Sequence, residues 1–273
     1  MIALVAIAVS AVGWLSYRSL EQALLPRVLD RIETNSRLVA TNLEAHVRST
    51  PGDVVTFRGL AAVTGLMRAR LNGGMDPVDN TTETLWRERL GNRLAAQMAL
   101  KPAYSLRFSG IEDNHREILR VDRSGPNGAV RIVPEAELKR VGDVPYFQDT
   151  TRLAADQVYV SPVHLHEENG ETPQIPVMQV ATPVMTSDGK PYGIVIVDVD
   201  MRPALDRARS SVRQGESAYL VGRNGDYLTH PDTAREFGSQ RGAPTDWRRD
   251  MPYFASLAGT TKGLSLQPNE DGQ

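Results

Sequence analysis

The sequence that decides the fold runs over residues 175–200, IPVMQVATPVMTSDGKPYGIVIVDVD. Two apolar runs, 175–186 and 192–201, are rich in β-branched residues, which fit a pleated and partly buried strand. Between them lies SDGK at 187–190, which is typical of the tight turn in a hairpin. We therefore predict two adjacent antiparallel strands.

The residues on the N-terminal side extend this pattern. Stretches 103–110, 116–123 and 129–135 alternate apolar and polar residues, and 157–166 is a further candidate strand. We expect a short helical piece at 134–140, a helix that begins at Pro145, and a helix at 204–212 that closes the unit near residue 213. Six strands with these helices predict an α+β domain on an antiparallel sheet.

The first third of the chain has a helical pattern. Residues 1–17 carry no charge and end in Trp14 and Tyr17, residue types favoured at the membrane interface. We expect a transmembrane helix with a clipped start, because spanning takes about 20 apolar residues; a cleaved signal peptide and a buried core helix are the alternatives. Residues 18–100 predict a long amphipathic stalk helix, with Pro26 at a kink or first turn, and then packing helices at 54–71 and 82–100.

Residues 214–273 predict a second and incomplete unit. SAYLVGRNGDYLTHP, at 217–231, indicates a strand, a turn at RNGD and another strand, and the sequence after Pro231 is polar and irregular.

Composition excludes several kinds of site. A formal net charge of −2 implies no field that would collect nucleic acid. The absence of cysteine excludes disulfides, thiolate zinc sites and cysteine nucleophiles. Because sequential catalytic and nucleotide-binding motifs are also missing, we expect no nucleic-acid partner, no cofactor and no enzymatic activity in this stretch.

A family likeness is carried by an ordered series of motifs: ILRVDR, GDVPYFQDT, VYVSPVHL, ATPVM before GKPYGIVIVDVD, and AYLVGRNGDYLTHPD before REFG. In this order they resemble the double Cache sensor domains of bacterial transmembrane receptors, over about residues 107–238. The resemblance implies a membrane-distal, PAS-like ligand-binding domain at 101–213 and a membrane-proximal PAS-like domain at 214–273. These would follow the membrane helix at 1–17 and the helical stalk at 18–100.

The resemblance also implies a location and partners. We expect a receptor of the bacterial inner membrane whose sensor faces the periplasm or exterior and which forms a homodimer through its long helix. GDYLTHPD and REFG look closest to sensor histidine kinases, while diguanylate cyclases and chemoreceptors carry the same sensor and stay as alternatives.

Two arginines are candidates for ligand contact. Arg120 faces away from Leu119 and Val121 if its strand is regular, and Arg107 has the same ambiguity in the preceding strand. An arginine beside a pocket suits a carboxylate, because its planar fork donates two parallel hydrogen bonds. A solvent-facing position or a structural ion pair is the alternative for both.

Asp198 and Asp200 share one strand face. We assign Asp198 to the ligand, since resembling amino-acid sensors bind an amine at this strand, and Asp200 to a cap of the following helix. A pair of carboxylates can also act as general acid and base, so an enzyme that uses them stays as a rival reading.

Three hydroxyl groups complete the candidate site. The region of Tyr146 caps the pocket in the resembling family, and Tyr159 and Ser161 share one face of their strand. Ordinary aromatic packing with Phe147 is the alternative for Tyr146, and edge hydrogen bonding is the alternative for the other two.

The best metal candidate is HLHEENGE, with His164, His166, Glu167 and Glu168. His164 and His166 share one strand face, but the segment is exposed and turn-like and lacks a third well-placed ligand. A solvated loop is therefore the favoured reading, and we predict no metal site.

These observations predict a receptor module that binds a small polar or anionic solute of the amino acid or organic acid class and signals through its stalk helices. The rival is a periplasmic protein-interaction domain without a small ligand. That rival would be favoured if side chains such as Met178 and Met185 filled the cavity.

Overall fold

The computed structural model describes residues 2–100, 103–123, 128–168, 171–213 and 215–252. They belong to two compact units, one up to His46 and one from Val47 onward. The first unit is essentially the single helix α1 (Ile2–Val47), which contains Pro26. Among the described helices, none is both long and apolar enough to cross a membrane, so the membrane helix at 1–17 stays a prediction.

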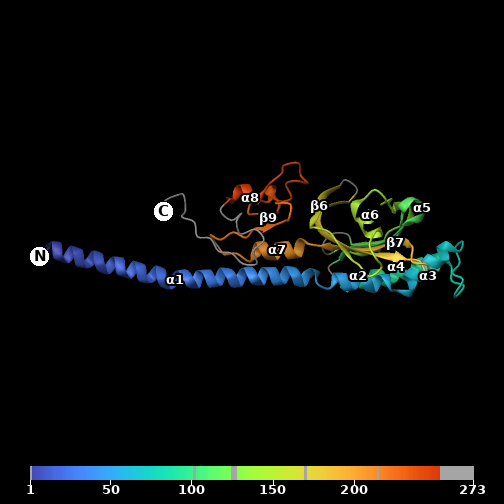
Figure 1. Ribbon diagram of the computed structural model, residues 1–273, viewed down its shortest axis with the longest axis horizontal. Coiled ribbons are helices and arrows are strands. Elements are labelled where there is room, and N and C mark those ends of the chain that lie inside the picture. The colour runs from blue at the N-terminus through green and yellow to red at the C-terminus, as the bar shows by residue number, and fades with distance from the viewer. Residues whose placement is uncertain (1, 101–102, 124–127, 169–170, 214, 253–273) are drawn as a thin grey trace. The chain divides into compact units, whose positions relative to one another are not determined.

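The second unit is built on an antiparallel sheet of seven described strands (Figure 1). The strands follow the order β3-β2-β1-β7-β6-β4, and β5 also pairs with β6. Their bounds are β1 Ala103–Gly110, β2 Glu117–Arg123, β3 Val130–Ile132, β4 Tyr159–Val160, β5 His164–Glu168, β6 Glu171–Met185 and β7 Pro191–Asp200. The α+β fold class is confirmed, and β6 and β7 form the predicted hairpin, with Gly189 at φ 78° in its turn.

The helices of this unit are α2 Thr50–Arg58, α3 Ala61–Leu71, α4 Glu83–Leu100, α5 Glu112–His115, α6 Pro145–Thr151 and α7 Arg202–Ser210. Some predicted elements are divided or shorter. The predicted helix at 54–71 is two helices, α2 and α3, because the chain turns through Gly59 and the extended Leu60. The predicted strand at 157–166 divides around Pro162 into β4 and β5, since proline cannot donate to a sheet ladder. The predicted helical piece at 134–140 contains only the 3₁₀ turn Glu135–Glu137.

The two faces of the sheet have opposite chemistry, because successive side chains of a strand point to opposite sides. Helix α4 contacts β1, β2 and β3, and α2 contacts β6 and β7. This helix-covered face is apolar and buried, with Leu106, Phe108, Leu119, Val121, Val195 and Val197 among its side chains. Figure 1 shows α2, α3 and α4 along one side of the sheet and α6 on the other.

The opposite face changes character along the strands. Under α6, Tyr146 and Phe147 pack with Ala181, Ile194 and Ile196 in a buried apolar cluster. Further along the same strands the alternate positions become polar and charged, and the candidate site lies there.

The connection between α3 and α4 is organised around one buried carboxylate. Asp76 Oδ1 and Oδ2 accept from Arg68 Nε and Nη2 at 2.8 and 2.7 Å. Trp86 Nε1 and the backbone N–H of Val78 donate to the same carboxylate at 3.1 Å each. These bonds, with those of Arg68 first, lower the pKa of Asp76 to about 2.

The C-terminal part of this unit contains a second, two-stranded sheet. It comprises β8 (Leu220–Val221) and β9 (Tyr227–Thr229), followed by the 3₁₀ helix Thr233–Arg235 and the helix α8 (Trp247–Asp250). The two strands agree with the predicted strand, turn and strand. The short helices occupy a stretch that the sequence indicated to be irregular. The domain boundary at 213/214 stays a prediction.

We expect acid to weaken the fold through Asp76. Its folded-state pKa of about 2 lies below the ordinary 3.8, so its contribution to stability is present above pH 3.8 and is lost as the pH falls toward 2. Asp76→Asn should be less stable than wild type at pH 7 and should lose less stability between pH 4 and pH 2. Urea midpoints at each pH would measure this. Equal loss in both proteins would contradict it.

Candidate functional site

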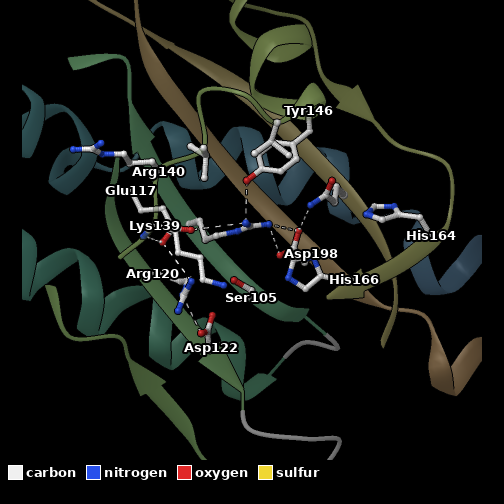
Figure 2. Close-up of a pocket in the computed structure, with 14 residues that line it drawn as sticks. Ser105, Glu117, Arg120, Asp122, Lys139, Arg140, Tyr146, His164, His166 and Asp198 are labelled. Atoms are coloured by element: carbon white, nitrogen blue, oxygen red, sulfur yellow. Dashed lines mark hydrogen bonds and ion pairs between the residues drawn. The ribbon is translucent and has the colours of Figure 1, made fainter. Parts of the chain in front are cut away.

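A cavity of about 220 Å³ lies at the polar end of the sheet, on the face that carries α6 (Figure 2). Strands β1, β2, β6 and β7 supply its floor, and the segment 139–146 with β5 supplies its walls. Because each strand contributes alternate residues, the floor gathers charged side chains that lie far apart in the sequence.

The centre of the floor is an ion pair between Arg107 and Asp198. Arg107 Nη2 donates to Asp198 Oδ1 at 2.6 Å and also contacts Oδ2. Arg107 Nη1 donates to Tyr146 Oη at 3.0 Å, and Gln179 Nε2 donates to Asp198 Oδ1 at 3.1 Å. The pairing of β1 with β7 produces this contact, since Ser105 stands opposite Asp198 in the register.

A second charged cluster lies beside the first. Glu117 Oε2 is 3.4 Å from Arg120 Nη1 and accepts from the backbone N–H of Lys139 at 2.9 Å. Glu117 Oε1 lies 3.8 Å from Arg107 Nη1, and Arg120 Nε lies 3.0 Å from Asp122 Oδ2. Glu117 therefore bridges the two arginines and ties the segment at Lys139 to the floor.

Burial and charge act against one another at Arg107. Burial, the largest single effect, lowers the pKa of its guanidinium, but Asp198, Tyr146 and Glu117 together raise that pKa by more, so the net direction is upward. Burial raises the pKa of Tyr146 above its ordinary value. The phenol therefore stays protonated at neutral pH, and because its oxygen accepts from Arg107, its own proton can be donated into the cavity.

Several buried polar atoms of the floor have no hydrogen-bond partner among the described residues. They are Ser105 Oγ, Arg107 Nε and Glu117 Oε1, and all three residues line the cavity. Leaving such an atom unpaired costs about 1–3 kcal/mol. A polar molecule in the cavity would remove part of that cost.

Charge is divided between the floor and the mouth. The buried floor holds three carboxylates, Glu117, Asp122 and Asp198, against the two arginines, so it carries one formal negative charge in excess. At the mouth Lys139 is half-buried and Arg140 is exposed. Neither forms an ion pair with a carboxylate in the part of the chain that the structure describes, so the mouth is positive.

The structure places the predicted site residues in two groups. Arg107, Arg120, Tyr146 and Asp198 all line the cavity. Tyr159 packs against the apolar cluster under α6, and Ser161 is used by the backbone, since its Oγ accepts from the N–H of Gln179 at 2.9 Å. Neither is among the lining residues. Their predicted ligand role, like that of the other four, is untested.

Asp200 lies outside the cavity, in agreement with the predicted capping role. Its Oδ1 accepts from the backbone N–H of Arg202, the first residue of α7, at 2.9 Å. Its carboxylate also pairs with the Arg202 side chain at 2.6 Å.

Sequence reasoning missed several lining residues. Asp122 and Ser105 could have been found from the alternation, since each stands two residues from a predicted arginine on the same strand face. Glu117 could not, because the ladder between β1 and β2 shifts register between Phe108 and Ser109.

The two histidines of the candidate metal motif also face the cavity. His164 and His166 lie on β5, which agrees with the predicted strand at 157–166, but they line the cavity, so the predicted solvated loop is corrected there. Within the described residues no group of three His, Asp or Glu side chains could hold a metal ion. The Glu167 and Glu168 side chains lie outside the described set.

Comparisons with known proteins support this architecture. The sequence profile of the family described as bacterial histidine kinase, sensor domain, matches residues 105–247, more than half of the chain. No curated protein matches the sequence significantly.

Among solved structures, the extracellular domain of vpHK1S-Z8, named as a histidine kinase, has a TM-score of 0.66 at 16% identity, over 88% of this chain and 81% of that one. A domain from Vibrio parahaemolyticus, named as a sensory box/GGDEF family protein, also has a TM-score of 0.66, at 15% identity, over 88% of this chain and 85% of its own. At these identities the likeness concerns the fold.

Removing one partner of the central ion pair should be costly. We expect Asp198→Ala to lower the free energy of unfolding by about 3–5 kcal/mol, because it removes the carboxylate nearest to the buried Arg107 guanidinium and leaves it with the more distant Glu117, 3.8 Å from Nη1. The double variant Arg107→Met, Asp198→Leu should lose less, because it removes both charges. Urea denaturation would measure this, with the exposed Asp188→Ala as a control. If the double variant lost as much free energy of unfolding as Arg107→Met and Asp198→Leu lose in sum, this account would be contradicted.

Proposed function

Since the chain belongs to the family of bacterial histidine kinase sensor domains, we propose that it is the extracytoplasmic ligand-sensing region of a transmembrane histidine kinase, with its ligand bound in the cavity at the polar end of the sheet. The observation that carries this proposal is the set of unpartnered buried polar atoms that line the cavity. Buried polar atoms without hydrogen bonds destabilise a folded protein, and a polar ligand that bonds to them would remove part of this destabilisation.

The size of the cavity limits the ligand. A volume of about 220 Å³ is below the roughly 300–1,000 Å³ of pockets that hold drug-sized molecules. The ligand is therefore a small solute.

The divided charge indicates the chemistry of that solute. The excess negative charge of the floor, with Glu117 Oε1 accepting no hydrogen bond from the described residues, suits an ammonium or hydroxyl donor. Lys139 and Arg140 at the mouth suit a carboxylate. A molecule with both groups, such as an amino acid, matches better than a simple organic acid, which would leave the floor acceptor unpaired.

Two rival readings are less well supported. Met178 stands opposite Val199 in the ladder, on the helix-covered face of the sheet, so it does not fill the cavity as a protein-interaction domain without a ligand would require. An enzyme that uses Asp198 and Asp200 would need both carboxylates at one reacting centre. Asp198 is engaged by Arg107, and Asp200 is engaged outside the cavity by Arg202.

The remaining parts of the proposal concern the whole receptor. Residues 1–17 anchor it in the inner membrane, the sensor faces the periplasm, and α1 pairs with its copy in a homodimer. Ligand binding then changes the output only if the ligand binds two conformations of this dimer with different affinity.

A thermal-shift screen of the 273-residue chain tests the ligand class. Three matched compounds, L-glutamate, 2-hydroxyglutarate and glutarate, keep the carbon skeleton and change the amine to hydroxyl and then to hydrogen. L-alanine, L-lactate and propionate form a shorter series. At about 100 times its dissociation constant a ligand adds about 2.7 kcal/mol, which raises Tm by roughly 5–10 °C for a domain of this size.

We expect the amino acid to give the largest shift within at least one series, and Arg120→Ala to reduce that shift. Arg152→Ala is the matched control, because Arg152 is exposed and lies outside the cavity. No shift with any amino acid or organic acid would contradict the proposal, and an equal shift with all three members of a series would contradict the role of the floor carboxylates.

A further inference from the structure

The side chain of Gln240 binds the β5 wall of the cavity from its outer edge. Leu165 N donates to Gln240 Oε1 at 2.8 Å, and Gln240 Nε2 donates to Leu165 O at 3.2 Å. The side-chain amide satisfies the backbone donor and acceptor of one residue, as a neighbouring strand would. The two residues are 75 positions apart in the sequence.

The ladder explains why Leu165 offers these groups. In an antiparallel pair, residues alternate between those that bond to the partner strand and those whose N–H and C=O point the other way. Leu165 stands opposite Pro176 of β6, which has no N–H to donate. Its backbone groups are thus turned to the outer edge of β5, where Gln240 meets them.

Leu165 is the residue between two lining side chains of the cavity. His164 and His166 point to the cavity side, and Figure 2 shows both beside the floor. A shift of β5 would therefore move both histidines, and the Gln240 contact acts at the midpoint between them.

Gln240 belongs to a firmly anchored turn. The backbone N–H of Phe237 donates to Tyr227 O in β9 at 2.8 Å. Ser239 Oγ donates to the buried Asp226 carboxylate at 2.8 Å, and Gln240 N donates to Phe237 O at 3.0 Å. The amide of Gln240 is therefore presented from a fixed position and not from a loose loop.

A second connection reaches the same turn from the floor. Strand β7 continues from Asp198 through the Asp200 cap into α7, and Arg209 of α7 forms two hydrogen bonds with the buried carboxylate of Glu236, at 3.1 and 2.7 Å. Residues 236–243, which we name the C-terminal turn, thus contact β5 of the cavity wall and α7, the helix that follows the floor strand β7.

We propose that Gln240 is a positioning residue of the binding site, which couples the β5 wall to the C-terminal turn. Any change of β5 on ligand binding then changes the turn, and by thermodynamic reciprocity the state of the turn changes the affinity of the cavity. The effect on ligand affinity rests on the proposed function, because it requires that the cavity binds a ligand. The contact itself is tested without any ligand.

Hydrogen–deuterium exchange on the 273-residue chain is the first test. Gln240→Ala should make the β5 amide of Leu165 exchange about tenfold faster, which corresponds to about 1.4 kcal/mol. Arg241→Ala is the matched control, because Arg241 lies in the same turn but donates to Thr233 O and not to β5. Unchanged exchange in β5 on Gln240→Ala, or the same increase on Arg241→Ala, would overturn the proposal.

Gln240→Glu separates hydrogen bonding from packing. A protonated carboxyl has one donor and one acceptor, as the amide does, whereas an ionised carboxylate only accepts and would face the carbonyl of Leu165. Measured against wild type at the same pH, β5 in Gln240→Glu should be protected at about pH 3.5 and lose that protection at pH 7, since a glutamate titrates near about 4.3. If the ratio of the Leu165 exchange rates in Gln240→Glu and wild type is the same at both pH values, the proposal is overturned.

The coupling is tested by perturbing the floor. Asp198→Asn should change the exchange of the C-terminal turn, and the change should be smaller when Gln240→Ala is also present. Equal changes in both backgrounds would overturn the coupling. These results do not depend on the ligand screen, so a blank screen with an intact Gln240 effect would count against the proposed ligand alone.

Discussion

A buried guanidinium needs a carboxylate within reach, and at Arg107 that need shapes the whole floor of the cavity. The partner, Asp198, lies 91 residues further along the chain and reaches Arg107 only because β7 lies beside β1 in one register. A slip of one residue in that pairing would turn the side chains of β7 to the wrong face, so sheet register and charge pairing specify each other. Tyr146 and Gln179 complete the pair from two other elements.

Much of the fold could be predicted from the sequence, because alternation and turn residues are local signals. Such patterns directly predict the hairpin of β6 and β7, the helix at Pro145, and which face of each strand is apolar and which is polar. Two breaks were not predicted from the sequence, the division of a strand at Pro162 and of a helix at Gly59. Both occur at residue types that often interrupt regular structure, since proline restricts the backbone and glycine frees it. Sequence patterns predicted the existence of these elements better than their ends.

The site was predicted only in part, because a cavity depends on register and not on spacing. Arg107, Arg120, Tyr146 and Asp198 meet there, and residue type with strand face was enough to select them. Tyr159 and Ser161 have suitable chemistry, but packing and a backbone hydrogen bond occupy them. Glu117 joins the site through a bulge. His164 and His166 join it through a predicted strand whose pairing with β6 turns them to the cavity. A pattern within one segment does not contain that information.

The division of labour between the two sheet faces has an evolutionary consequence. Val195, Val197 and their neighbours on the helix-covered face hold the domain together, while the intervening residues at the polar end of the strands, among them Asp198, face the cavity. Substitutions at the intervening positions can therefore alter recognition while the packing against α2 and α4 stays intact. Such an arrangement allows relatives to diverge in what they detect while the scaffold is inherited unchanged.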